Sequence, residues 1–200
     1  FMSDLHGEYD AFYHIINNCS GVIKEKVAML YGDELTVFEQ QELCTLIYYP
    51  REKLSKLMDE NKVSDEWYRN VLNQLIQIAK LLSSKYTRSK VRKAMPVDFA
   101  YIIDELIHAQ KDEDDNRSVY HRQIMETILS LHNGDEFLVA LTDLIKRLAV
   151  DHLHILGDIY DRGPHADKIL DLLMEHHSVD IQWGCLLYTS PSPRDSTSSR

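Results

Sequence analysis

The sequence is poor in cysteine and in positive charge, and both shortages exclude classes of protein. Its three cysteines, Cys19, Cys44 and Cys185, are widely spaced and form no Cys-x-x-Cys pair. They indicate neither a disulfide framework nor a zinc ribbon, and a reducing, cytosolic setting fits best. The 22 lysine and arginine residues are outnumbered by 32 aspartate and glutamate residues, so the net charge is −10. A general polyanion binder would be basic, so a phosphorylated substrate would need a local positive site or a metal ion.

Long apolar runs are also absent. No stretch approaches the ~18 apolar residues of a membrane span, and no charged-then-apolar leader precedes Phe1. We therefore expect a cytoplasmic protein with no membrane partner and, given its acidic charge, no nucleic-acid partner. The chain does not begin with methionine, and a candidate ligand pair lies at residues 4 and 6 with almost no strand before it. We expect that this end is cut from a longer protein.

The other end of the chain has an unusual composition. The segment 185–200 is rich in serine, threonine and proline, and it carries no apolar residue after Tyr188. Such a composition cannot build a core. The segment also resembles the translated sequencing adapters that end some assembled metagenomic reading frames. We expect a disordered, non-native tail, and a Ser/Pro regulatory tail is the alternative.

One stretch carries most of the candidate chemistry, Gly157–Gly163, with the sequence Gly-Asp-Ile-Tyr-Asp-Arg-Gly. It follows the apolar run 153–156, and its flanking glycines let the backbone approach a ligand closely. A turn directly after a strand is where an open α/β sheet exposes functional groups. A second stretch, Ser3–Gly7, places Asp4 and His6 two residues apart. In an extended strand end, these two side chains would point to one side and form a ligand pair.

These residue types indicate a metal and phosphate site. Mixed oxygen and nitrogen ligands favour manganese, iron or zinc over a thiolate site. A two-metal centre holds its ions ~3.5–4 Å apart, activates a water and clamps the attacking and leaving oxygens of a phosphoester, which requires a bridging carboxylate. Asp158 is the natural bridge, Arg162 can grip the phosphate bidentately, and Asp161 is better placed to orient a histidine. The alternative, an ordinary turn with a salt bridge, is disfavoured by the presence of Asp4 and His6 in the same chain.

Between the two stretches the pattern is almost wholly helical, with a turn signal at Gly32-Asp33 and a polar loop at 111–117. A short strand at 152–156, a helix at 166–177 and a strand at 179–184 then form a parallel strand, crossover helix, strand unit. The predicted class is therefore α/β, interrupted by a large all-α insertion. The helices expected before that unit are 8–17, 36–49, 51–60 with Pro50 at its first position, 64–82 with Ser64 as N-cap, 96–107, 119–132 and 135–150.

A basic cluster and a histidine pair each allow two interpretations. The candidate residues for a phosphorylated ligand or effector are Lys85, Arg88, Lys90, Arg92 and Lys93. The favoured alternative for this cluster is a solvated helix face paired with nearby acids. His152 and His154 would share a strand face, but they precede the carboxyl end of the strand, so packed or hydrogen-bonded structural histidines are favoured over metal ligands.

The two stretches resemble the first two signature blocks of the calcineurin-like metallophosphoesterases of the phosphoprotein phosphatase type. Trp183-Gly184 stands where the third block, Gly-Asn-His-(Asp/Glu), would begin, and the tail replaces the rest. The long helical insertion is similar to class III (bacterial, Firmicutes-type) fructose-1,6-bisphosphatase. The likeness covers residues 1–184 and implies an amino-proximal fragment of a protein several times longer. The segments that carry it are 46–50, 84–94, 98–103, 150–154 and 177–184.

The resemblance implies a partial calcineurin-like metallophosphatase core and a role for each motif residue. Asp4 and His6 would ligate one metal, and Asp158 would bridge. Asp161 would orient the catalytic histidine, and Arg162 would hold the phosphate. The implied organisation is a first motif at 1–9, a helical insertion at 10–149, the core unit with the second motif at 150–184, and the tail at 185–200.

The parent protein implied by this resemblance is a manganese-dependent gluconeogenic enzyme that removes the 1-phosphate of fructose 1,6-bisphosphate and responds to AMP and phosphoenolpyruvate. Since the later ligands are missing, we expect the 200-residue chain itself to be inactive. A phosphoprotein or dinucleotide polyphosphate phosphatase is the alternative within the same superfamily, which the long insertion disfavours. A helical interaction module with a vestigial metal turn is the alternative from another class.

Overall fold

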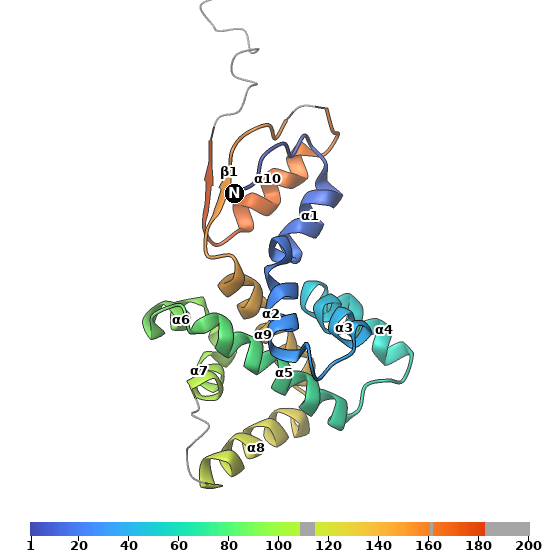
Figure 1. Ribbon diagram of the computed structural model, residues 1–200, viewed down its shortest axis with the longest axis vertical. Helices are drawn as coiled ribbons and strands as arrows, with labels where there is room; N and C mark the ends of the chain where they lie inside the picture. The colour runs from blue at the N-terminus through green and yellow to red at the C-terminus, as the bar shows by residue number, and fades with distance from the viewer. Residues whose placement is uncertain (109–114, 161, 183–200) are drawn as a thin grey trace, which may run out of the picture. The chain divides into compact units, whose positions relative to one another are not determined.

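The computed structural model describes residues 1–108, 115–160 and 162–182, which divide into two compact units (Figure 1). The α/β unit consists of Phe1–Ile16 together with the chain from Val150, and the helical unit is the continuous segment Asn17–Ala149. The predicted tail at 185–200 lies outside the described residues. Within the described ranges, no helix is both long and apolar enough to cross a membrane.

The helical unit is built around α5 (Asp65–Ser83) and α9 (Gly134–Ala149), which pack against each other and contact most of the other helices. Both helices carry apolar residues at helical spacing, which places Leu75, Ile78 and Leu141 in positions without solvent exposure. The remaining elements are η1 (Cys19–Gly21), α2 (Val22–Tyr31), α3 (Val37–Tyr48), α4 (Pro50–Asp59), α6 (Arg88–Ala94), η2 (Val97–Phe99), α7 (Ala100–His108) and α8 (Asp115–Ser130).

Several helices begin at the residue that the sequence indicates. The Ser64 hydroxyl accepts a hydrogen bond from the Trp67 N–H, which confirms the predicted N-cap of α5. Pro50 is the first residue of α4, as predicted. Thr36 and Glu39 form a reciprocal capping box at the start of α3. These caps satisfy backbone N–H groups that a helix start leaves without partners.

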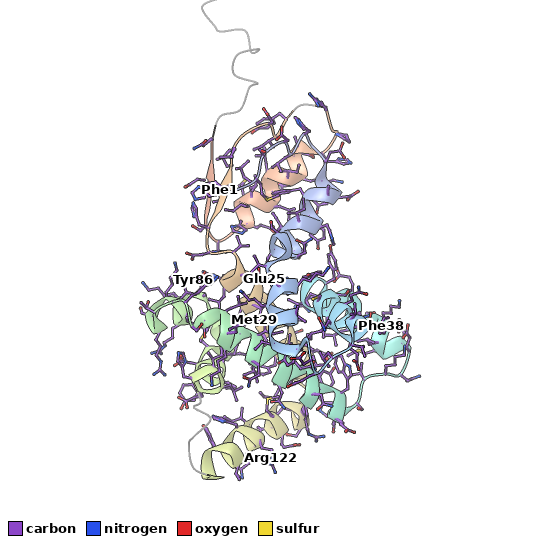
Figure 2. The ribbon with its side chains drawn as sticks, in the orientation of Figure 1. Phe1, Glu25, Met29, Phe38, Tyr86 and Arg122 are labelled. Carbon is purple, nitrogen blue, oxygen red and sulfur yellow. The ribbon has the colours of Figure 1, made fainter. Side chains whose placement is uncertain are left out.

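Other helix limits differ from the sequence prediction. Helix α8 begins at Asp115, inside the segment predicted as a polar loop, because a polar composition does not prevent a helix and an acidic residue is favourable at its start. The predicted helix at 96–107 is a short 3-10 turn followed by α7. Helix α2 was not predicted as a separate element. Exposed apolar side chains also occur in this unit, and Met29 and Phe38 are marked in Figure 2.

The α/β unit contains most of α1 (Tyr9–Asn17), β1 (Leu153–Ile155), α10 (Ala166–Glu175) and β2 (Val179–Ile181). Strands β1 and β2 pair in parallel, with His154 opposite Asp180, which confirms the predicted strand, helix, strand unit. On its other side β1 is bridged by Met2, whose N–H donates to His154 O (2.8 Å). The core of this unit consists of Leu5, Phe12, Leu153, Ile155, Ile159, Ile169 and Leu173.

Candidate metal and phosphate site

The site is built from two loops, Ser3–Gly7 and Gly157–Gly163. Backbone hydrogen bonds join these loops to each other. The His6 N–H donates to Asp158 O (2.7 Å), and the Gly163 N–H donates to His6 O (2.6 Å). The His165 N–H adds a third bond, to Gly7 O (3.2 Å). Segments about 150 residues apart in the sequence are therefore fixed against each other, as the sequence prediction requires of two motifs that share a site.

Two glycines make this close approach possible. A Cβ atom on Gly7 would overlap the backbone of Gly163, and a Cβ atom on Gly163 would overlap the backbone of His6 and Gly7. Gly7 also has φ +68°, a conformation that favours glycine. The glycines at the ends of the two motifs therefore allow the loops to touch each other, in addition to any approach of a ligand.

The candidate residues adopt an unusual backbone conformation. Asp4 (φ 57°), His6 (φ 47°), Asp158 (φ 56°) and Arg162 (φ 72°) all have positive φ without being glycine. Each such residue costs of order 1–3 kcal/mol, and they cluster at functional sites because the surrounding structure must hold them there. The bonds between the loops supply that support at this site.

The geometric reason given for the Asp4 and His6 pair is wrong. An extended strand end would place both side chains on one side, but their positive φ values put them in a turn after Met2. The turn nevertheless brings them together, with Asp4 Oδ1 3.5 Å from His6 Nε2. Asp4 is exposed and also accepts a hydrogen bond from the Ser3 hydroxyl (2.7 Å). Their role as metal ligands stays a prediction.

A buried apolar residue anchors each loop. Leu5 lies between Asp4 and His6 and is 6% exposed, and Ile159 follows Asp158 and is 2% exposed. Both belong to the core cluster of the α/β unit. These anchors were not predicted, although an apolar residue next to each polar one was the available signal. They fix the loops to the core, and of their polar neighbours Asp4 is exposed while His6 and Asp158 are half-buried.

The remaining motif residues are only partly placed. Asp158 is half-buried at the turn after β1, Arg162 is exposed, and Asp161 lies outside the described residues. In the part of the chain that is described, the ligand atoms of Asp4, His6 and Asp158 do not converge into one three-ligand group. Asp4 and His6 are adjacent and could both donate to one metal ion. Asp158 lies on the second loop, which is hydrogen-bonded to the first. The bridging role of Asp158 stays a prediction.

The basic cluster at 85–93 makes contacts within the helical unit. Arg88 Nη2 donates to Asp104 Oδ2 (2.7 Å), and the ammonium groups of Lys85 and Lys90 lie 5.0 and 4.9 Å from the centre of the Tyr86 ring. Burial acts to raise the pKa of Asp104, but the hydrogen bond and charge of Arg88 outweigh it and lower that pKa. Arg88 is thus paired with an acid, and an effector role for the cluster stays a prediction.

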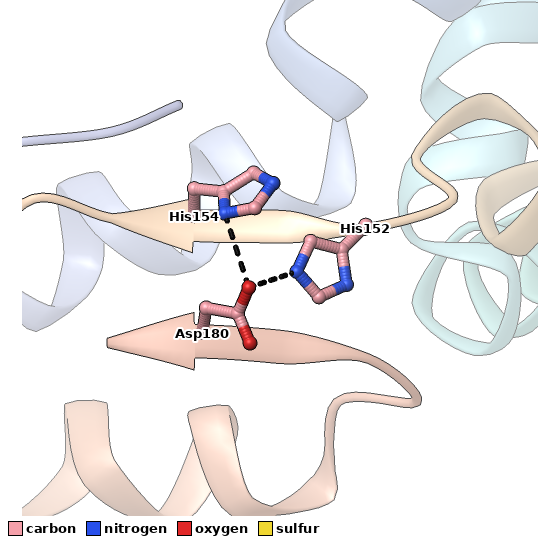
Figure 3. A group of neighbouring side chains, drawn as sticks. All are labelled: His152, His154 and Asp180. Atoms are coloured by element: carbon pink, nitrogen blue, oxygen red, sulfur yellow. Dashed lines mark hydrogen bonds and ion pairs between the residues drawn. The ribbon is translucent and has the colours of Figure 1, made fainter. Parts of the chain in front are cut away.

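The structure brings the histidine pair together with an acidic residue, Asp180, that was not predicted to lie beside it. His152, His154 and Asp180 each offer a ligand atom, and these atoms lie within 4.8 Å of one another (Figure 3). The hydrogen bonds of His152 agree with the favoured structural interpretation of this residue. Asp180 comes from the neighbouring strand, so the register of β1 and β2 was needed to find the group.

The α/β unit therefore carries its candidate polar residues on two joined loops, one after β1 and one after the Met2 bridge, at the carboxyl end of a small parallel sheet. The sequence profile of the Firmicute fructose-1,6-bisphosphatase family matches residues 1–186. The chain belongs to this family.

Curated relatives agree with the family assignment. The chain is 52% identical over 184 residues to a fructose-1,6-bisphosphatase class 3 of Listeria innocua, and 53% identical over 184 residues to proteins of the same name from Clostridium beijerinckii and Clostridium botulinum. Each alignment covers 92% of this chain and 28% of the relative. The chain therefore spans about a quarter of the length of these proteins. No solved structure gives a significant match.

Proposed function

We propose that this chain is part of a metal-dependent phosphatase that hydrolyses fructose 1,6-bisphosphate to fructose 6-phosphate and phosphate in gluconeogenesis. The observation that carries the proposal is the set of backbone hydrogen bonds that joins the Ser3–Gly7 and Gly157–Gly163 loops, because a shared metal and phosphate site requires these two segments to lie next to each other. The family assignment supports the choice of substrate.

In the proposed site, Asp4 and His6 would hold a metal ion, and Asp158 would supply a further carboxylate ligand. Manganese is the proposed metal, and when bound it lowers the pKa of a coordinated water and draws negative charge from the phosphate oxygens. Arg162, exposed on its loop, binds the phosphate through its planar guanidinium and stabilises the charge that develops as the ester bond breaks. Asp161 would accept the N–H of the catalytic histidine and orient it.

Several finer points belong to the same proposal. We infer a calcineurin-like core, with its first motif at 1–9, its second at 150–184 and the helical insertion at 10–149. The two-stranded parallel sheet and the helical unit Asn17–Ala149 support this organisation, except that residues 10–16 belong to the α/β unit. AMP or phosphoenolpyruvate would bind at the basic cluster through residues such as Lys90 and Arg92, which are exposed. The location is proposed to be cytoplasmic.

The test requires the chain extended with its own downstream sequence to the length of its relatives. With manganese added, the extended protein is expected to release phosphate from fructose 1,6-bisphosphate faster than from a phosphoserine peptide or a dinucleotide tetraphosphate. Preference for either of the other substrates would replace the proposed activity with a different phosphatase. Absence of metal-dependent release from all three would favour an interaction module with a vestigial turn.

A separate comparison tests the role of Arg162. The Arg162→Lys variant of the extended protein keeps a charge but loses the bidentate fork, so a fall in the rate of about tenfold or more is expected. Arg51→Lys is the matched control, because Arg51 is an exposed arginine of the helical unit paired with Glu136 (3.4 Å). Equal rates for the two variants would remove Arg162 from the phosphate site.

A further inference from the structure

The group His152, His154 and Asp180 lies on the face of the small sheet that is opposite to its core. Side chains alternate along β1, so the buried Leu153 and Ile155 point into the core, and the two histidines point to the other face. Asp180 is opposite His154 in the register of β1 and β2. Figure 3 shows the three side chains converging above the strand pair.

Two of the three distances between the candidate donor atoms are near those around a small metal ion, and all three atoms lie within 4.8 Å of one another. Asp180 Oδ2 lies 2.8 Å from His152 Nε2 and 3.3 Å from His154 Nδ1. In a tetrahedral zinc site with bonds of about 2.0–2.1 Å, neighbouring ligand atoms are about 3.3 Å apart. Small rotations of the side chains would therefore let all three atoms reach one ion. Two histidines and one carboxylate also form a known donor set for zinc and iron.

We propose that His152 Nε2, His154 Nδ1 and a carboxylate oxygen of Asp180 form a further metal site, which binds a divalent transition-metal ion such as zinc. This site shares no ligand with the proposed catalytic site, whose candidate ligands are Asp4, His6 and Asp158. The two sites also lie at different ends of β1, because His152 precedes the strand and Asp158 follows it. The inference does not depend on the phosphatase activity. An ion at this position cross-links β1 to β2, and with three protein ligands it keeps one position open for water.

Neighbouring residues already orient the two imidazole rings. His152 Nδ1 lies 2.6 Å from Ser178 Oγ, and a serine hydroxyl can accept the Nδ1–H that the metal-bound ring carries. The ring of Phe1 stacks on His154, with centroids 4.7 Å apart and an angle of 14° between the planes. The side chains of His152, His154 and Asp180 are 32%, 36% and 62% exposed, so an ion can enter from solvent.

The alternative is a hydrogen-bonded cluster that holds no metal. His152 Nε2 can donate a hydrogen bond to Asp180 Oδ2, and His154 Nδ1 lies at ion-pair distance from the same oxygen, so these two contacts alone would explain the observed distances. The two accounts differ in what zinc does to the ring nitrogens. Metal binding must replace the contact between His152 Nε2 and Asp180, whereas a purely hydrogen-bonded cluster leaves it intact.

The direct test is a zinc titration of the intact chain followed by nitrogen NMR of its histidine rings. We expect the nitrogen resonances of His152 Nε2 and His154 Nδ1 to shift as zinc is added. The shifts should reach a plateau when one zinc ion per chain is bound at this site. The pattern must persist in the Asp4→Asn variant, because that change removes a ligand of the other candidate site. Unchanged ring nitrogens at saturating zinc would overturn the proposal and leave only the hydrogen-bonded cluster.

Variants give an independent reading of the same site. The His154→Gln variant should weaken zinc binding at this site at least a hundredfold, and Ser178→Ala should weaken it about ten- to a hundredfold through the loss of ring orientation. His176→Gln is the matched control, since it replaces a histidine near β2 that the proposal does not use. Protection of the Gln182 amide, which donates to Ile155 O (2.8 Å), reports whether each variant keeps the strands paired. Equal zinc affinity in His154→Gln and His176→Gln with the strands paired would contradict the assignment.

Discussion

In the helical unit, large apolar side chains such as Phe137, Leu75 and Ile103 have no solvent exposure, and α5 and α9 pack along their length. In the α/β unit the core is a smaller cluster of seven residues, and the two candidate loops, each of which ends in a glycine, are joined by backbone hydrogen bonds. The first unit is therefore held mainly by burial of apolar surface, and the second depends more on close backbone contact.

This difference indicates where the chain can change without losing its function. Apolar burial is not directional, so the helical unit can accept substitutions that keep volume and pattern. The joined loops cannot accept a side chain at Gly7 or Gly163, because its first atom would overlap backbone. The polar candidates Asp4, His6 and Asp158 lie on these less tolerant loops, and the large apolar core lies in the other unit.

The largest expected effect is on the helical core. Phe137 is fully buried and its ring contacts that of Phe99, with centroids 5.3 Å apart, so Phe137→Ala should cost about 3–5 kcal/mol of unfolding free energy in this unit. Hydrogen exchange should show lost protection along α5 and α9. Phe38→Ala is the control, because Phe38 is 70% exposed and its loss should have little effect. Similar effects of the two variants would contradict a stability based on burial.

A substitution in the joined loops should come next in size. Gly7→Ala must adopt a positive φ, at a cost of order 1–3 kcal/mol, and must also separate the loops to remove its overlap with Gly163. The amides of His6 and Gly163 should then exchange faster. Gly21→Ala is the matched control, since Gly21 also has positive φ (+84°) but nothing within 4 Å of its Cβ position. If Gly21→Ala is as damaging as Gly7→Ala, close loop contact is not the reason for the glycine.

An ion pair in the helical unit gives a pH-dependent effect. Arg88 lowers the pKa of Asp104 below its ordinary value of 3.8, so the pair stabilises the fold above that pH and the contribution is lost as the pH falls through the lowered pKa. Asp104→Asn should cost about 1 kcal/mol at pH 7, a value discounted for the exposure of Arg88, and less below pH 3.8. Thermal unfolding at several pH values measures this difference, with Asp143→Asn as a surface-pair control. A cost that is independent of pH would exclude the ion pair as its cause.

The smallest expected effect is at a helix start. Ser64→Ala removes the acceptor for the Trp67 N–H and should cost about 0.5–1 kcal/mol. Ser55→Ala, at an exposed position inside α4, should be neutral or slightly stabilising, because alanine favours a helix interior. Chemical unfolding of both variants makes the comparison. A loss of stability in Ser55→Ala equal to that of Ser64→Ala would show that the cap contributes nothing.

Much of the fold could be predicted because its signals are local. Ser64 caps α5, Pro50 begins α4, and the apolar spacing around α9 follows directly from the sequence. The start of α8 could not be predicted, because polar residues such as Asp115 and Asn116 are compatible with both a loop and a helix end.

The site was harder to predict because its geometry depends on distant contacts. His6, which has positive φ, is held by two backbone hydrogen bonds to the Gly157–Gly163 loop, and a local strand pattern cannot reveal them. The same is true of His154 and Asp180, which meet only through the register of β1 and β2. The identity of the candidate residues therefore came from the sequence, and their arrangement required the fold.

The most direct test of the central claim is manganese-dependent phosphate release from fructose 1,6-bisphosphate by the full-length form of this protein carrying Asp158→Asn. Asp171→Asn, an exposed position on α10 in the same unit, is the matched control. If the joined loops form the metal and phosphate site, Asp158→Asn should lower the rate by at least a hundredfold, and Asp171→Asn should leave it within about twofold of the unmodified protein. Undiminished release by Asp158→Asn would contradict the account.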